Sequence, residues 1–591
     1  MTLSKNTLYK LIFCSILLLA FSLRILALKA LGESPYYTFL LPDERYYHNW
    51  ALAILKGQPI AEIFEYAPLP AYFMAMVYKI FSTDIFFIRL SNILFNITGC
   101  ILVFLTARII VGRSWALLSF AFAACSAELI FYSVVPLKTS LSFFLFALFI
   151  YLVLLSIRTL SWKCVFAVGL TLGAAMTVRP NVLVFLPIII PVILYFNDEL
   201  FSYSRLVLIG VVVFLGFICT ALPLSLHNFS LTGKFAFLPA QSGFLFYCTN
   251  TVNNPTPFYQ PVAFASSHPQ EQGVHFVIEA SKRQGKVLNA QQASTYWQLE
   301  VIKEAFQDPQ LALKKIWQKT LILFSYTENS DHYNLGVMAE IVPFFRILQI
   351  KFWVFMLLGY AGLLFGFRRS SAIGCLSILW LAYLLTLLLY STGNRFYLPV
   401  LVILIPSSTW LIQYIFEMIS TLPDYKVALR VSVFLLVLAL LGKMPVNGTG
   451  DLSKHYNTLA FAFKEQGNMD MAIRYWQKSS ERTEAYSDVA SLFLAGDDYQ
   501  RYGPKMAVER LRRISDSSFM SAAKYSTLGD IYQHHNSLKE ALQFYRKSLS
   551  INFGQIRARE EITTILSTLN PDKLPDEIKE LEWVASFYHD Q

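Results

Sequence analysis

Long apolar runs separated by short polar turns dominate most of the first 446 residues of this 591-residue chain. A run of about 20 apolar residues matches the hydrocarbon thickness of a bilayer, and a helix is the form in which such a run crosses it. Only 15% of the residues are charged, whereas soluble domains carry roughly 25%. Residues 1–446 are therefore predicted to form an all-α, polytopic membrane domain.

The runs and their breaks predict about eleven membrane-spanning helices. They lie near residues 10–31, 86–107, 115–135, 139–157, 163–178, 181–196, 206–224, 347–367, 372–391, 396–416 and 426–444. Basic residues are concentrated in every second connection, namely Lys5, Lys10, Arg108, Arg113, Arg158, Lys163, Arg205, Arg368, Arg369, Lys426 and Arg430. Because basic loops stay in the cytoplasm, we expect a cytoplasmic N-terminus and outward-facing loops at residues 32–85 and 225–346.

The net charge of +10 comes largely from these loop clusters, which suit topology and headgroup contacts, so no nucleic-acid partner is expected. Arg24, near the outer end of the first predicted span, is expected to extend toward the headgroups. Most of the seven cysteines lie within apolar runs. There a cysteine acts as a small hydrophobe, and their spacing indicates neither a disulfide framework nor a cysteine metal site.

After residue 450 the composition changes to a soluble, helical pattern. One stretch matches the spacing of a tetratricopeptide repeat, with Tyr525, Leu528, Gly529, Tyr532, Ala541 and Tyr545. The register recurs at Tyr456, Leu459, Ala460, Phe463, Ala472 and Trp476, and in a degraded copy at Tyr486, Val489, Ala490, Phe493, Ala507 and Leu511. Residues 451–591 are therefore predicted to form a C-terminal α-solenoid of such repeats, outside the membrane and able to bind a protein partner.

Acidic residues gather where the chain leaves the first predicted span. The stretch from Leu41 to His48 carries Asp43 and Glu44, and Glu65 stands just before Pro68. A carboxylate at a membrane surface can accept a proton from a hydroxyl or bind a metal, and ordinary packing requires neither. Structural roles stay open, since Asp43 fits a helix N-cap, Glu44 a first-turn dipole partner and Glu65 a solvated loop acid.

Three cations, Lys138, Arg179 and Arg395, stand at the predicted outer ends of spans, against the positive-inside trend. A guanidinium binds phosphate bidentately, so we expect Arg395 to hold the phosphate of a lipid carrier, with Arg179 and Lys138 beside it. The alternative is that these side chains extend to headgroups.

His48 follows Glu44 by one helical turn. It could join Asp43 and Glu65 in a divalent metal site, although a plain surface histidine explains the same spacing.

The order of these motifs resembles that of the GT-C membrane glycosyltransferases, which include protein O-mannosyltransferases and the aminoarabinose and Rgt-type lipopolysaccharide transferases. Beyond the two acidic motifs, the matching pieces are Phe87-Ile88-Arg89-Leu90, Thr177-Val178-Arg179-Pro180 and Asn394-Arg395-Phe396-Tyr397-Leu398-Pro399. The resemblance covers most of residues 10–420. It implies that Asp43 is the catalytic or metal-associated acid of the first outer loop and that Glu65 is a second loop acid.

The resemblance also implies an activity. A hexosyl or pentosyl group would pass, with inversion, from a polyprenyl-phosphate carrier to a lipid, polysaccharide or protein acceptor. The expected location is the outer face of a bacterial inner membrane, with the C-terminal domain in the periplasm. A divalent metal is possible, since relatives differ in needing one.

Two other functions fit parts of the sequence. An O-antigen-type oligosaccharide ligase or polymerase also has large outer loops, but it lacks the early Asp-Glu pair and uses diphosphate-linked donors. A non-enzymatic transporter or envelope-assembly scaffold would need charges inside the spans and internal symmetry. In this sequence the polar residues of the membrane domain are concentrated at one outer face. The sugar, the acceptor and the metal requirement stay open.

Overall fold

A computed structural model describes residues 4–58, 66–196, 202–233, 235, 237, 239, 241–266, 269–326, 330–348, 350–390, 392–421, 425–446 and 448–569. These residues are almost entirely helical. Within the described ranges, the only β-type pairing is an isolated bridge between Ser126 and Ile350. The expectation of an all-α protein is confirmed for this part of the chain.

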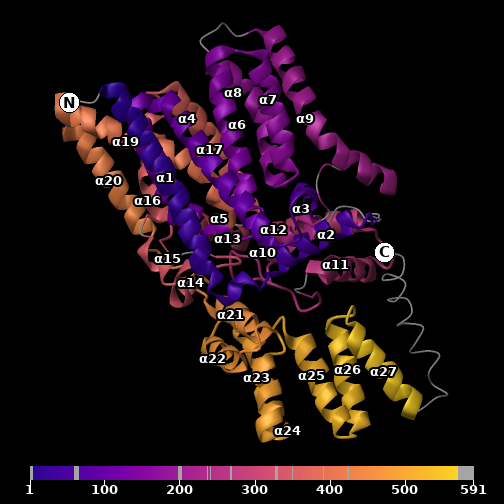
Figure 1. Ribbon diagram of the computed structural model, residues 1–591. Coiled ribbons are helices and arrows are strands. Elements are labelled where there is room, and N and C mark those ends of the chain that lie inside the picture. Colours follow the sequence, from indigo (N-terminus) through magenta and orange to yellow (C-terminus); the bar gives the residue numbers. More distant parts are fainter. Residues whose placement is uncertain are drawn as a thin grey trace.

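The N-terminal domain is a bundle of helices (Figure 1). Its members are α1 (Lys5–Gly32), α4 (Ile85–Cys125), α5 (Ala127–Val134), α6 (Thr139–Thr159), α7 (Trp162–Met176), η2 (Pro180–Val184), α8 (Phe185–Tyr195), α9 (Tyr203–Thr232), α16 (Phe352–Gly366), α17 (Ser371–Leu389), α18 (Asn394–Tyr397), η3 (Leu398–Val400), α19 (Leu401–Thr421) and α20 (Tyr425–Leu441). In the described part of the chain, six helices are long and apolar enough to cross a membrane: α1, α4, α6, α9, α17 and α19. This supports a membrane protein, whereas the number of about eleven spans stays a prediction.

α4 doubles back on itself at Gly112. This glycine has a φ of 79°, which lies in the region that glycine adopts at little cost. In one straight helix Phe104 and Phe120 would be about 24 Å apart along the axis, yet their ring centroids are 5.7 Å apart. The two halves are therefore antiparallel, and they occupy the places of the spans predicted near 86–107 and 115–135.

α7 and α9 approach each other so closely that their contact requires glycine. A Cβ atom on Gly169 would lie 2.0 Å from the carbonyl oxygen of Val213, and one on Gly216 would lie 2.2 Å from that of Phe166. Small residues commonly allow membrane helices to bring their backbones together in this way. α9 continues to Thr232, beyond the predicted end of its span near residue 224.

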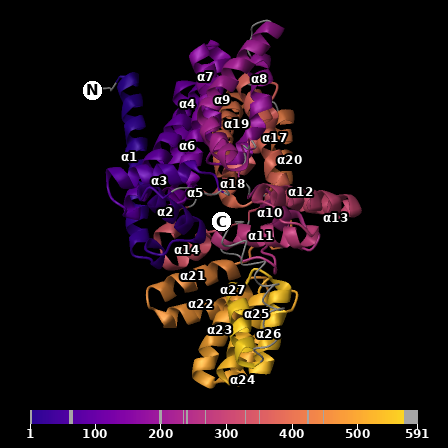
Figure 2. The same cartoon turned by 90° about the vertical axis from the view of Figure 1, so that its right-hand side faces the viewer.

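Two outer segments lie at one end of the bundle, between it and the C-terminal domain (Figures 1 and 2). The first contains η1 (Pro35–Tyr37), α2 (Pro42–Leu55) and α3 (Leu69–Ile80). The second contains α10 (Ser242–Asn250), α11 (Pro269–Gln284), α12 (Ala290–Gln307), α13 (Pro309–Ile322), α14 (Leu335–Ile341) and α15 (Phe344–Ile347). They form the surface from which the candidate site is built.

The basic turns lie together with the start of the chain, at the far end of the bundle from the outer segments (Figure 1). Arg113 donates a hydrogen bond of 2.7 Å to Asn6, and Arg158 donates one of 2.5 Å to the carbonyl oxygen of Ile109. Which end faces the cytoplasm stays a prediction.

The C-terminal domain consists of helices that pack in consecutive pairs (Figure 2). They are α21 (Ser453–Glu465), α22 (Met469–Ser480), α23 (Ser487–Tyr502), α24 (Pro504–Arg512), α25 (Ser521–His534), α26 (Leu538–Ile551) and α27 (Ile556–Leu569). A Cβ atom on Gly529 of α25 would lie only 2.6 Å from the ring of Tyr545 of α26. The small and aromatic positions of the predicted motif thus meet in space, while the assignment of the helices to tetratricopeptide repeats stays a prediction.

Candidate active site

The carboxylate of Asp43 lies in a cluster of charged groups at the start of α2. The helix begins at Pro42 with Leu41 as its N-cap residue, so Asp43 is not the cap that its sequence position also allowed. Its Oδ2 atom accepts a hydrogen bond of 2.6 Å from Nη1 of Arg395 and lies 3.1 Å from Nε2 of His332. The side chains of Asp43 and Arg395 are only 18% and 14% exposed.

Asp331 holds the other side of the Arg395 guanidinium. Its Oδ2 atom lies 2.7 Å from Nη2 of Arg395, and its Oδ1 atom lies 3.2 Å from Nζ of Lys454, at the start of α21 in the C-terminal domain. A continuous chain of ion pairs therefore runs Asp43, Arg395, Asp331, Lys454. It joins the first outer loop, the turn before α19, the second outer segment and the C-terminal domain.

The charges of this cluster reinforce one another. Burial alone would raise the pKa of Asp43, but the nearby charges of His332 and Arg395 hold it well below its usual range. Asp331 is likewise held low, against burial, by Arg395, Lys454 and His332. Burial and Arg395 lower the pKa of His332, but the two carboxylates outweigh them and raise it. Both aspartates are therefore carboxylates at neutral pH.

Glu44, the next residue of α2, forms its hydrogen bonds with other groups than Asp43 does. One of its carboxylate oxygens accepts a hydrogen bond of 3.0 Å from the backbone N–H of Leu41, and the hydroxyl of Tyr333 donates to the carboxylate at 2.9 Å. Burial raises its pKa to about 7, although both hydrogen bonds act in the opposite direction. Glu44 thus closes the first turn of α2 and ties it to the residue after His332, which fits the structural alternative for this acid.

Arg179 and Lys138 lie beside the cluster without a carboxylate partner. Nη2 of Arg179 donates a hydrogen bond of 2.7 Å to the carbonyl oxygen of Arg395, and Nζ of Lys138 donates one of 2.9 Å to the hydroxyl of Tyr47. Within the described residues neither cation forms an ion pair, and Nε of Arg179 is buried without a hydrogen-bond partner.

The buried environment of Arg179 and Lys138 disfavours their charged forms. Burial, helped by the nearby charge of Arg179, lowers the pKa of Lys138 to about 7, and burial lowers that of Arg179 to about 10. Uncompensated buried charge is unfavourable, so two such cations on one side of the site create a strong preference for an anion.

The motifs that are distant in sequence are held together by hydrogen bonds to backbone carbonyl oxygens. The N–H of Leu69, where α3 begins, donates to the carbonyl oxygen of Thr177 at 3.2 Å, just before Arg179. Asn92 of α4 donates to the carbonyl oxygen of Leu137 at 3.1 Å, just before Lys138. The first contact ties the segment of Arg179 to the first outer segment, and the second ties the segment of Lys138 to α4.

The predicted metal site is not assembled by the residues that the structure describes. Glu65 lies outside them. Nδ1 of His48 lies 2.7 Å from the hydroxyl of Tyr78, and Asp43 is bound to Arg395 and His332. In the described ranges no group of three His, Cys, Asp or Glu side chains is arranged to hold a metal ion, so a metal at Asp43, Glu65 and His48 stays a prediction.

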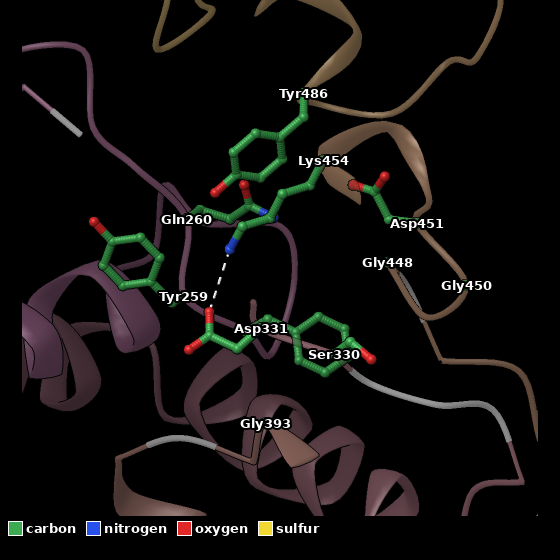
Figure 3. Close-up of a pocket in the computed structure, with 11 residues that line it drawn as sticks. Tyr259, Gln260, Ser330, Asp331, Gly393, Gly448, Gly450, Asp451, Lys454 and Tyr486 are labelled. Carbon is green, nitrogen blue, oxygen red and sulfur yellow. Dashed lines mark hydrogen bonds and ion pairs between the residues drawn. The ribbon is translucent and has the colours of Figure 1, made fainter. Parts of the chain in front are cut away.

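A pocket of about 60 Å³ adjoins Asp331, at the junction of the two domains (Figure 3). Its walls come from the second outer segment, the turn before Arg395 and the C-terminal domain, with the residues Phe258, Tyr259, Gln260, Ser330, Asp331, Gly393, Gly448, Gly450, Asp451, Lys454 and Tyr486. The Lys454 side chain reaches across it toward Asp331. Aromatic rings, an amide and charged groups share this wall, which suits a polar ligand.

Sequence reasoning missed Asp331 and Lys454 and gave no role to His332. For Asp331 and His332 the available signal is placement, because Ser330-Asp331-His332-Tyr333 stands near the end of a polar outer segment and Asp43 and Glu44 stand near the start of another. Lys454 carries no comparable signal, because nothing in a helical repeat sequence marks which lysine faces another domain.

Comparisons with known proteins give similarity to glycosyltransferases. A family model described as dolichyl-phosphate-mannose-protein mannosyltransferase matches residues 65–223. No curated protein sequence matches the chain. One similar solved structure is the archaeal oligosaccharyltransferase AglB from Archaeoglobus fulgidus in complex with an inhibitory peptide and a dolichol-phosphate, at 14% identity and a TM-score of 0.40, covering 85% of this chain and 60% of that one.

A second is ArnT from Cupriavidus metallidurans bound to undecaprenyl phosphate, at 14% identity and a TM-score of 0.32, covering 80% of this chain and 92% of that one. The chain thus spans about 60% of the length of the AglB structure. The family match falls within the membrane domain and includes the predicted loop cations Lys138 and Arg179.

Proposed function

We propose that this protein is an inverting membrane glycosyltransferase that takes a sugar from a polyprenyl-phosphate carrier. The observation that carries the proposal is the pair of cations, Arg179 and Lys138, that lack a carboxylate partner among the described residues and lie beside the ion pair of Asp43 and Arg395. A phosphate group supplies the missing negative charge, and a lipid phosphate reaches a site at the end of apolar helices. The family match over residues 65–223 supports the same reaction class.

The reaction we propose is a single in-line displacement. The acceptor oxygen forms a bond to the anomeric carbon of the sugar, the bond from that carbon to the phosphate oxygen breaks, and the lipid phosphate leaves with the electron pair. Arg179, Lys138 and Arg395 stabilise the departing phosphate. Removing one such preorganised donor typically costs about 10²–10³-fold in rate.

Asp43 is the proposed base for the proton of the acceptor hydroxyl. A positioned general base contributes about 10²–10⁴-fold. In the proposed acceptor path, a polar acceptor approaches through the pocket beside Asp331, from the side of the C-terminal domain. A glycan, a lipid headgroup or a protein hydroxyl all fit this chemistry, and a bacterial inner membrane with a periplasmic C-terminal domain is the location we propose.

The test separates phosphate binding from chemistry. Purified protein in lipid nanodiscs is titrated with undecaprenyl phosphate, and binding is followed directly, for example by native mass spectrometry. We expect Arg179→Gln and Lys138→Met each to weaken binding by about 10-fold or more, because each removes a charge-assisted contact worth about 1.5–3 kcal/mol. Asp43→Asn should retain binding while lowering sugar transfer from a labelled polyprenyl-phosphate sugar by at least 10²-fold.

Lys282→Met is the matched control, since Lys282 is an exposed cation of α11 that contacts the ring of Phe553. Equal binding by wild type, Arg179→Gln and Lys282→Met would contradict the phosphate assignment. Consumption of a diphosphate-linked oligosaccharide in place of the monophosphate donor would instead favour an O-antigen-type ligase. Absence of any donor turnover, with binding intact, would favour a scaffold.

A further inference from the structure

The helices α12 and α13 of the second outer segment expose an unusual amount of apolar surface. Phe306 is 81% exposed and Trp317 is 53% exposed. They belong to a set of large apolar side chains that we call the apolar stripe, consisting of Leu299, Ile302, Phe306, Leu313, Ile316 and Trp317. Isolated exposed apolar residues are common, but a set gathered on the exposed sides of two consecutive helices points to a binding surface.

The spacing within the stripe is helical. Leu299, Ile302 and Phe306 follow one another at three and four residues along α12, so they share one face. The opposite face of α12 is packed, and the indole N–H of Trp297, which is fully buried, donates to the carbonyl oxygen of Phe276 at 3.0 Å. The stripe is therefore the outward face of a helix that is firmly seated on α10 and α11.

α13 has the same two-sided organisation. Its residues Leu313, Ile316 and Trp317 are exposed on one side of the helix, whereas Lys319, on another side, is fully buried. Nζ of Lys319 donates to the side-chain oxygen of Asn250 at 2.7 Å and to the carbonyl oxygen of Leu388 at 3.0 Å. The latter oxygen belongs to the last turn of α17, so Lys319 attaches α13 to the end of a helix that is long enough to cross a membrane.

This attachment fixes the position of α13 along the long axis of the helical bundle. α17 exposes Leu381, Leu385 and Leu389 at intervals of four residues. In a helix that crosses a bilayer such a row faces lipid, and this row ends beside Lys319. Just after the C-terminal end of α13, the backbone N–H of Tyr326 donates to the carbonyl oxygen of Gly442, which lies just beyond the end of α20. Figure 2 shows α12 and α13 extending sideways at the level where α17 and α20 end.

We propose that α12 and α13 lie in the interface of the bilayer that the bundle crosses, with the apolar stripe inserted among the headgroups and upper acyl chains. The stripe continues the lipid-facing row of α17, and tryptophan is the residue type enriched at this depth. Lys303 and Lys314 are exposed on the same helices, where their ammonium groups can reach anionic headgroups while their stems stay in apolar surroundings.

The placement connects the lipid surface to the candidate site. The turn that begins after α17 carries Arg395, and Lys319 holds the carbonyl oxygens of Leu388 and Leu389 immediately before it. α13 thus connects the proposed membrane surface to the turn that positions Arg395. The inference needs only a chain that crosses a membrane, and it does not depend on the proposed sugar transfer.

The test measures depth directly and needs no activity. An environment-sensitive fluorescent amino acid is introduced singly at Phe306, Leu313 or Trp317 of the full chain, which is reconstituted in vesicles of phosphatidylethanolamine and phosphatidylglycerol. The same probe at Leu385 of α17 serves as the lipid reference, and at Arg513, whose side chain is 74% exposed in the C-terminal domain, as the aqueous reference. Quenching by acyl-chain-brominated lipid is compared with quenching by iodide.

We expect all three positions to be quenched several-fold more by brominated lipid than the probe at Arg513, and less than the probe at Leu385. Iodide quenching equal to that at Arg513 would overturn the proposal. Protection from both quenchers that rises with protein concentration would also overturn it, because it would assign the stripe to a second copy. All positions are exposed, so the substitutions leave the packed faces intact.

Discussion

From the ion pair between Lys454 and Asp331 we predict part of the free energy with which the C-terminal domain docks on the candidate site. Lys454 is 29% exposed and Asp331 is 19% exposed, with 3.2 Å between Nζ and Oδ1. At that distance and an effective dielectric constant of about 20, the attraction is about 5 kcal/mol before desolvation. Desolvation of the two groups removes much of it.

Replacing Lys454 by Met leaves Oδ1 of Asp331 without its ammonium partner, while Oδ2 keeps Nη2 of Arg395 at 2.7 Å. The loss should therefore be smaller than for a carboxylate stripped of every partner. A buried acceptor left unsatisfied costs about 1–3 kcal/mol, so the docked state of the domain should become less populated relative to its open state by about 5–150-fold.

The assay is hydrogen–deuterium exchange of the full chain in nanodiscs, followed by mass spectrometry. In Lys454→Met we expect faster exchange in peptides covering residues 330–341 and 453–465, by up to the same 5–150-fold where local opening limits exchange. Lys478→Met is the matched control in the same pair of helices. Its partner Glu340 lies 3.0 Å away, but the two side chains are 38% and 35% exposed, so the change should stay within about 1 kcal/mol.

A double-mutant cycle with Asp331→Asn completes the test. The Lys454 and Asp331 substitutions should be non-additive by about 1–3 kcal/mol, because they remove the same interaction. Strict additivity, or equal exchange in Lys454→Met and Lys478→Met, would refute the conclusion that this ion pair docks the domain.

Two further predictions concern the buried acid and the domain core. The fold raises the pKa of Glu44 from 4.5 to about 7, so Glu44 stabilises the protein most below about pH 4.5 and loses this contribution as the pH rises through 7. Glu44→Gln should therefore flatten the pH dependence of thermal stability between pH 5 and 8 by at most about 3 kcal/mol, and an unchanged slope would contradict the assignment. Gly529→Ala should destabilise the C-terminal domain by about 1–3 kcal/mol, because the added methyl group overlaps the ring of Tyr545. Gly496→Ala is the control, and with open space around its Cβ position it should be neutral or stabilising by about 1 kcal/mol. Equal melting temperatures of the two variants would show that α25 and α26 are loosely packed.

The sequence predicts the elements that depend on local pattern. Apolar runs placed the helices of the bundle, and the turn at Gly112 falls between two predicted spans because Arg108 and Arg113 interrupt the apolar pattern there. Arg24 shows the limit of this reasoning. It was expected to extend to the headgroups, but it is fully buried and donates hydrogen bonds to Asn96 at 2.7 and 3.0 Å. A count of charges along one apolar run does not reveal that an asparagine on another helix can bind the guanidinium.

The same limit applies to the site. Asp43 and Arg395 stood out as charges at the ends of spans, and their direct contact depends on two turns that only the folded bundle brings together. Asp331 and Lys454 come from segments without a distinctive motif. The catalytic roles of these residues stay predictions, which the binding and transfer measurements described above test.

The contacts of Asp43 also order the steps of the proposed reaction. A carboxylate held by Arg395 and His332 is a weak base, since its pKa lies well below the usual range, and a weak base gains little from proton transfer near neutral pH. A donor phosphate bound at Arg179 and Lys138 would compete for the guanidinium of Arg395, which already donates to two carboxylates. In the proposed reaction, drawing Arg395 toward the phosphate would weaken its hold on Asp43 and raise the basicity of that carboxylate. In the proposed reaction, water that enters before the donor would therefore meet a weak base, and the acceptor would be activated only once the sugar is in place.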